Sequence, residues 1–197
     1  MRRVVPLLLV LAACVGSAGD GDSTLPLSIP NQGGSLEGHG PRGFAGQGVG
    51  LFAGDELNPS FPADDGIQIW LTFDVSSVVA IQRAVLRSDA LSVRGDPFET
   101  LGELRVEQVD DSAFEPESFD LPATSDPAAC SADVGAGTFE CDVTEIVAAA
   151  AVAGDERVQL RLKFDELSDG DGETDLAMFF LTDSNTNEAG IFTLEIS

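Results

Sequence analysis

The chain has 197 residues and a formal net charge of −24 at pH 7, because 34 acidic residues outnumber 10 lysines and arginines. A surface this acidic repels nucleic acid, so we expect no nucleic-acid partner. The length suits one well-buried domain, and a hydrophobic fraction of 43% argues against disorder.

The first 13 residues, MRRVVPLLLVLAA, have the layout of a secretory signal, with two arginines before a short apolar run that ends in small residues. The run is too short to cross a bilayer, which needs roughly 20 helical residues. The order Leu11-Ala12-Ala13-Cys14 resembles the lipobox of bacterial lipoproteins. That resemblance implies that Cys14 carries a diacylglycerol and anchors an exported chain at the outer membrane or cell surface. The alternative is a plain signal peptide with an unmodified cysteine.

Residues 14–27 are small, polar and acidic and predict a flexible tether, after which residues 28–197 are expected to form a single domain. The glycine-rich stretch 30–50 predicts irregular backbone with one short strand on either side. His39, the only histidine, lies in this stretch without an ordered partner for a catalytic or metal site. We interpret His39 as a bystander.

Alternation of apolar and polar residues predicts strands at 67–75 and 157–165, and the end of the chain predicts another at 191–197. Their expected inward residues include Phe73 and Phe164. Weaker strands are predicted at 84–93, 101–109, 138–143 and 176–182, and one short helix is predicted at 144–153, with Gly154 as its stop. This pattern predicts an all-β fold, an antiparallel two-sheet β-sandwich of the jelly-roll kind.

Trp70 falls on the polar face of the 67–75 strand, where an exposed ring would offer a stacking platform for a sugar. Sugar-binding sheets generally present several aromatic rings, and the chain has no tyrosine. We therefore favour the alternative that the glycine-rich segment or a second layer covers Trp70.

Cys130 and Cys141 remain as an even pair once Cys14 is assigned to the anchor. In an exported protein an even pair indicates a disulfide, and closing so short a loop is worth roughly 3 kcal/mol. A metal site would lack further ligands, and a reactive thiol would lack a histidine nearby in sequence.

The acidic stretch 168–175 places Asp169, Asp171, Glu173 and Asp175 at alternating positions, with glycines that permit tight turns. Such turns could aim several carboxylate oxygens at a calcium ion, although the stretch lacks the glycine and glutamate of an EF-hand. We weigh weak calcium binding against an ordinary solvated hairpin loop and favour the loop.

Two short sequence motifs, here called the two marks, follow one another along the chain. The first, WLTFDVSSVVAIQRAVLRS, contains Phe73-Asp74-Val75-Ser76, and the second, FECDVTEIV, contains Asp142-Val143-Thr144. In this order they are similar to the DNRLRE-type (disaggregatase-related) β-sandwich modules, over about residues 48–197. An aspartate at the end of a strand also accepts hydrogen bonds from the turn that it opens, and Asp142 with Thr144 can cap the helix. We therefore interpret both marks as structural.

The resemblance implies a non-catalytic module of the kind that accompanies carbohydrate-active and surface proteins. We expect a lipid-anchored exported protein that binds or presents a surface polysaccharide or other envelope polymer, with no cofactor except possible calcium. One alternative is a carboxylate-dependent glycan hydrolase or lyase, which the lone histidine and the absence of a nucleophile motif disfavour. The other is a purely structural envelope lipoprotein.

Overall fold

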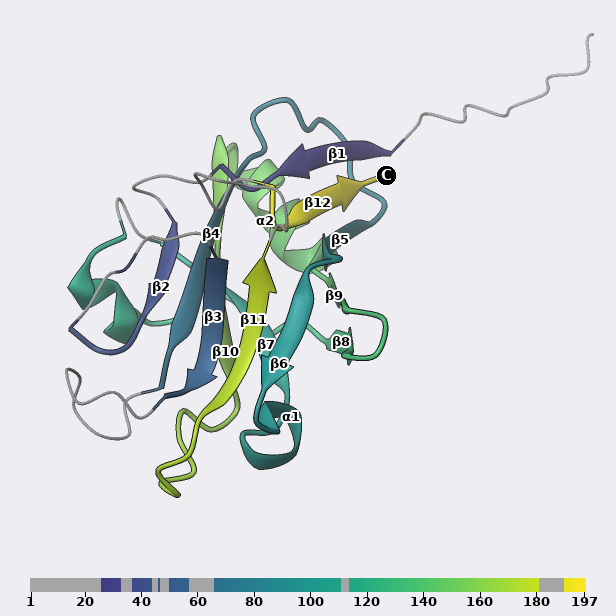
Figure 1. The fold of residues 1–197 in the computed structure, drawn as a ribbon. Coiled ribbons are helices and arrows are strands. Elements are labelled where there is room, and N and C mark those ends of the chain that lie inside the picture. The colour runs from purple at the N-terminus through teal and green to yellow at the C-terminus, as the bar shows by residue number, and fades with distance from the viewer. Residues whose placement is uncertain are drawn as a thin grey trace, which may run out of the picture.

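The computed structural model describes residues 26–32, 37–43, 46, 50–56, 66–110, 114–180 and 190–197 (Figure 1). Within these ranges the chain forms three antiparallel sheets and two short α-helices. The prediction of an all-β antiparallel sandwich is confirmed, with the strands divided by hydrogen bonding into three sheets rather than two.

The sheets differ in size and are built from strands far apart in sequence. The five-stranded sheet has the order β1 (Leu27–Pro30), β12 (Thr193–Ile196), β5 (Ala84–Ser88), β9 (Thr138–Asp142) and β8 (Cys130–Asp133). The four-stranded sheet has the order β2 (Gly38–Gly40), β4 (Gln68–Asp74), β10 (Arg157–Phe164) and β7 (Leu104–Val109). The three-stranded sheet has the order β3 (Gly50–Asp55), β11 (Asp175–Phe180) and β6 (Leu91–Arg94), and Figure 1 shows it in front of the four-stranded sheet.

The alternating pattern of β4 and β10 places their predicted inward residues in the core. The two strands pair antiparallel, with Leu71 opposite Leu160 and Phe73 opposite Val158, and all four side chains are fully buried. One cluster of buried apolar residues joins the inner faces of all three sheets to the helix at Thr144–Ala153. Burying each such side chain contributes about 1.5–3 kcal/mol, so this shared core holds the sheets together.

The predicted helix is confirmed as α2 (Thr144–Ala153), and Gly154 ends it in the left-handed conformation, with a φ of 79°. A second helix, α1 (Pro97–Thr100), and a 3-10 helix at Pro116–Asp120 were not predicted. A helix of four or five residues is too short to show an apolar repeat, so the sequence pattern carries no signal for either.

The predicted disulfide is present. Cys130 of β8 lies directly opposite Cys141 of β9 in the strand register, and their sulfur atoms are 1.99 Å apart. Cys141 is 1% exposed and belongs to the core, so the bridge ties the edge strand of the five-stranded sheet to buried structure.

Loss of this bridge is expected to lower the free energy of unfolding by about 3 kcal/mol, because the cross-link restricts the unfolded chain. For a domain of this size that loss corresponds to a fall in Tm of about 6–12 °C. Circular dichroism melts with and without reductant measure it, and the Cys130→Ala/Cys141→Ala double variant separates it from other effects of the reductant. A fall of less than about 2 °C would contradict the expectation.

Candidate functional site

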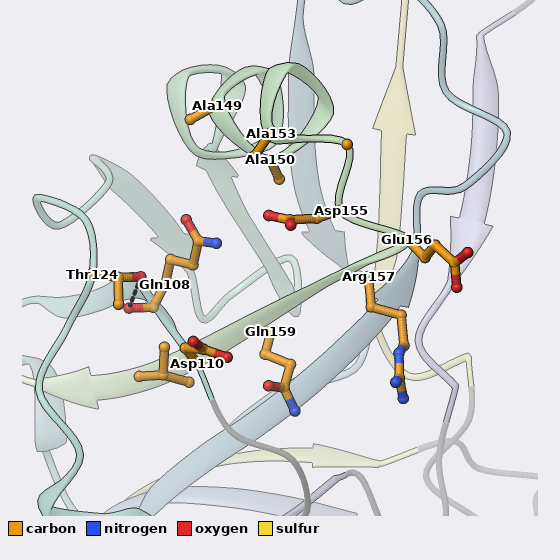
Figure 2. Close-up of a pocket in the computed structure, with 12 residues that line it drawn as sticks. Gln108, Asp110, Thr124, Ala149, Ala150, Ala153, Asp155, Glu156, Arg157 and Gln159 are labelled. Atoms are coloured by element: carbon orange, nitrogen blue, oxygen red, sulfur yellow. Dashed lines mark hydrogen bonds between the residues drawn. The ribbon is translucent and has the colours of Figure 1, made fainter.

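An open concavity of about 700 Å³ lies between α2, the end of β7 and the start of β10 (Figure 2). Three alanines on one side of α2, Ala149, Ala150 and Ala153, form its apolar wall. Its other side chains are mostly polar: Gln108, Asp110, Thr124, Asp155, Glu156, Arg157 and Gln159.

Backbone hydrogen bonds fix the two sides of this pocket. On one side, the amide and hydroxyl of Thr124 donate to the carbonyl of Gln108 at 2.8 and 3.3 Å, so the chain after β7 folds back along that strand's edge. On the other side, the left-handed Gly154 ends α2, and the amide of Asp155 donates to the carbonyl of Ala150 at 3.0 Å. This turn brings Asp155 to the pocket mouth, as Figure 2 shows.

The lining suits a neutral ligand rich in hydroxyl groups. Amide, carboxylate and guanidinium side chains donate or accept several hydrogen bonds each, as sugar hydroxyls require. Three carboxylates against one arginine leave the rim negative, which disfavours an anionic ligand. The lining residues come from three separate segments that share no motif, which is why sequence reasoning missed them.

Trp70 is not available as a stacking platform in this structure, because its side chain is 3% exposed. The rings of Phe114 and Phe119 cover it, with centroids 4.8 and 6.4 Å from its own. Gly38 pairs with Trp70 between β2 and β4, and a Cβ at Gly38 would lie 2.4 Å from the Phe114 ring. The missing side chain therefore makes room for the covering rings. The favoured alternative, that Trp70 is covered, agrees with its 3% exposure, and the exposed stacking platform is excluded for the described structure.

The segment that carries Phe114 and Phe119 also buries the charged side chain of Arg161. Residues 114–121, here called the covering segment, lie over the outer face of β10. The alternation of apolar and polar residues places Arg161 on that polar face, and it is nevertheless only 4% exposed. Its Nε donates to Glu107 Oε1 at 2.7 Å, and its Nη1 donates to the carbonyls of Phe119 and Leu121 at 3.2 and 2.7 Å. Arg161 thus joins two sheet strands to the covering segment.

The two sequence marks adopt the same local geometry. The Ser76 hydroxyl and amide donate to Asp74 Oδ1 at 2.6 and 3.0 Å, and those of Thr144 donate to Asp142 Oδ1 at 2.6 and 3.1 Å. These hydrogen bonds hold the pKa of both carboxyls below its usual value. The N-cap of α2 is Val143 rather than Asp142, so the predicted cap acts from one position earlier, on the first helical amide.

The acidic loop brings together three of the four carboxylates considered for calcium. Oxygens of Asp169, Asp171 and Asp175 lie within 4.8 Å of one another, and Glu173 is not in this group. Asp175 is 5% exposed. It accepts hydrogen bonds from the amide of Asp96 at 2.5 Å and from the hydroxyl of Thr100 at 3.1 Å. Calcium binding here stays a prediction, which a comparison of Tm in millimolar calcium and in chelator tests.

His39 lies on β2, outside the pocket lining, with its ring edge-on to Phe52 at a centroid distance of 4.5 Å. Its buried Nδ1 has no hydrogen-bond partner among the described residues. Burial lowers the pKa of His39 to about 4, so the ring is neutral at pH 7. A packed, neutral ring is what the bystander interpretation expects.

Lowering the pH from about 6.5 to 4 is expected to remove about 3 kcal/mol of stability through His39. The unfolded chain binds a proton near pH 6.5 and the folded chain only near pH 4, so the contribution is complete above pH 6.5 and is lost as pH falls. Since His39 is the only histidine, its ring protons give an unambiguous NMR titration, with His39→Gln as the non-titrating control. A midpoint near 6.5 in the folded protein would contradict the burial argument.

Cys14, the expected leader and most of the tether lie outside the described residues. None of the helices that the structure describes combines the length and apolar character needed to span a bilayer. No family model matches the chain, and no curated protein matches it in sequence. The resemblances to a lipobox and to DNRLRE-type modules therefore stay predictions.

Proposed function

We propose that the chain is a lipid-anchored, exported, non-catalytic protein whose β-sandwich binds a surface polysaccharide or a similar envelope polymer. The observation that carries this proposal is the polar pocket beside α2, since its side chains offer hydrogen bonds to hydroxyl groups and it is open to solvent. Attachment through Cys14 rests on the resemblance of residues 11–14 to a lipobox.

A binding role is supported over a catalytic one by what lines this pocket. Among the residues that the structure describes, the lining contains no histidine, lysine, cysteine or serine, and its one hydroxyl, that of Thr124, donates to a backbone carbonyl. Catalysis by a hydroxyl or thiol nucleophile needs a base beside it, and the described lining does not provide that pair. The carboxylates of Asp110, Asp155 and Glu156 are the groups that the alternative, a carboxylate-dependent glycan hydrolase, would use. The negative rim further favours a neutral polymer over a sulfated or uronic one.

The test is a binding screen of the full-length chain in detergent against neutral cell-wall and extracellular polysaccharides. Gln108→Ala and Asp155→Ala each remove one polar side chain from the pocket and should weaken binding about 5–30-fold. Glu117→Ala, on the exposed side of the 3-10 helix and outside the pocket lining, is the matched control and should bind normally. Binding that is lost in none of the pocket variants, or no binding to any polymer, would refute the proposal.

A further inference from the structure

One end of the sandwich gathers the start of β1, the C-terminus and two connections between strands. Ile196 of β12 pairs with Leu27 at the start of β1 and with Ala84 at the start of β5. The segment 76–83 leads from the end of β4 to the start of β5, and its last two amides donate to the carbonyl of Ser197 at 2.7 and 3.0 Å. Figure 1 shows the C-terminus beside the start of β1.

The helix α2 belongs to the same end. It leads from the end of β9 to the start of β10, and these strand ends pair with the start of β5 and the end of β4. The amide of Val143 donates to the carbonyl of Ala84 at 2.9 Å, and the amide of Val75 donates to the carbonyl of Glu156 at 2.9 Å. We call the region formed by the start of β1, segment 76–83, α2 and the C-terminus the α2 end.

Exposed apolar side chains concentrate at the α2 end. Four large apolar side chains are exposed in the described chain, and three of them are here: Leu27 at 42%, Val79 at 97% and Val152 at 90%. The fourth, Val134, is 43% exposed in the turn between β8 and β9, at the opposite end of those strands. The acidic loop 168–175 also lies at the opposite end, since it follows the end of β10.

The proposed lipid on Cys14 would keep the start of β1, at the α2 end, within reach of the bilayer. Leu27, at the start of β1, follows Cys14 by 13 residues, a reach of at most about 45 Å for fully extended chain. The charges on the α2 end and directly beside it are mainly negative: Asp74, Asp142, Glu145, Asp155 and Glu156 against Arg83 and Arg157. Asp155, Glu156 and Arg157 of this set also line the pocket beside α2. An anionic lipid surface would therefore repel this end, whereas a zwitterionic surface would not.

We propose that the α2 end rests on a zwitterionic lipid surface, with Val79 and Val152 buried at the headgroup boundary and the acidic loop facing away from the membrane. The inference rests on the lipid anchor of the proposed function. Moving these two exposed valines out of water is favourable, and the anchor makes the contact effectively intramolecular.

The test uses the full acylated chain on phosphatidylcholine vesicles. An environment-sensitive fluorophore is attached to a single introduced cysteine in Val79→Cys, Val152→Cys or, as the matched control, Val134→Cys. Each change replaces an exposed valine, so none should disturb the core, and Tm before labelling confirms this. Emission is expected to shift to the blue on vesicles at positions 79 and 152 and to stay unchanged at position 134.

Co-sedimentation with the vesicles is measured in the same samples. If the chain sediments but positions 79 and 152 respond no more than position 134, the orientation is wrong while the anchor stands. If the chain does not sediment, the anchor fails and the orientation fails with it. Polymer binding is assayed separately in detergent, so its loss or retention is independent of both results.

Discussion

Replacing Glu37 by glutamine is expected to lower the free energy of unfolding by about 3 kcal/mol, although the substitution exchanges one oxygen for an amino group. Glu37 is 0% exposed. Its Oε1 accepts the amides of Gln32 and Thr72, each at 2.8 Å, and its Oε2 accepts Asn31 Nδ2 at 2.6 Å. A glutamine that keeps its oxygen on the two backbone amides must point its amino group at the amino group of Asn31.

The orientation of Asn31 cannot relieve this conflict. Its Oδ1 accepts the amide of Phe192 at 2.8 Å, so turning its amino group away would lose that bond and place a donor against a donor. Glu37 is therefore hydrogen-bonded to β4 through Thr72, and Asn31 is hydrogen-bonded to Phe192, which precedes β12. In each of these bonds the donor and the acceptor cannot be exchanged. Breaking that match leaves buried donors unsatisfied.

Replacing Asn31 by aspartate should restore the stability that Glu37→Gln loses. Asn31→Asp alone places two carboxylates against each other and is also expected to destabilise by about 3 kcal/mol. In the Asn31→Asp/Glu37→Gln double variant the amino group of residue 37 again meets an oxygen, and the other oxygen of residue 31 still accepts Phe192. Urea unfolding of the four proteins gives the coupling energy, expected to exceed about 2 kcal/mol. Additive losses in the double variant would contradict this account.

How far the sequence predicts this fold depends on which residues carry the information. The alternation in β4 and β10 identified the core residues Phe73 and Phe164 because a period of two assigns each side chain to a face. The same alternation could not show that Trp70 and Arg161, on the opposite face, are covered, since a strand pattern says nothing about what packs on it. The cover comes from a segment with no periodicity of its own.

Glu37 and the pocket residues escaped sequence analysis for a related reason. Glu37 lies in a glycine-rich stretch and is buried only because three donors, one of them on β4, converge on it from positions up to 35 residues away. Hydrogen bonds between residues so far apart leave no pattern in the sequence around Glu37. The disulfide and the two aspartate turns were predictable because counting and adjacent positions suffice for them.

Removing the Arg161 guanidinium is expected to cause a loss of stability of about 3–5 kcal/mol, because Arg161→Met leaves the carboxylate of Glu107 buried without its main partner. Lys163 Nζ, at 3.1 Å from Glu107 Oε1, remains, but it is a single cation on a flexible stem and does not reproduce the planar fork. The carbonyls of Phe119 and Leu121 also lose their donor. The covering segment should therefore loosen over Trp70.

The fluorescence of Trp70 reports this loosening directly, since it is the only tryptophan in the chain. In the native protein the buried ring, which is 3% exposed, should emit in the blue and be protected from a neutral quencher. In Arg161→Met the emission should shift to the red and the ring should become accessible to the quencher. Glu117→Ala is the matched control: this glutamate lies on the exposed side of the same segment, and its loss should change the stability by about 0.5 kcal/mol or less.

A second variant distinguishes the buried charge from simple loss of packing. Arg161→Met/Glu107→Leu removes both charges and should recover part of the stability that Arg161→Met loses, because no unpaired carboxylate remains beneath the covering segment. If the double variant is no more stable than Arg161→Met, the donors to Phe119 and Leu121 carry the effect and not the ion pair. If Arg161→Met unfolds like the native protein with Trp70 still protected, the covering segment is held by its aromatic rings alone, and the role given to Arg161 is wrong.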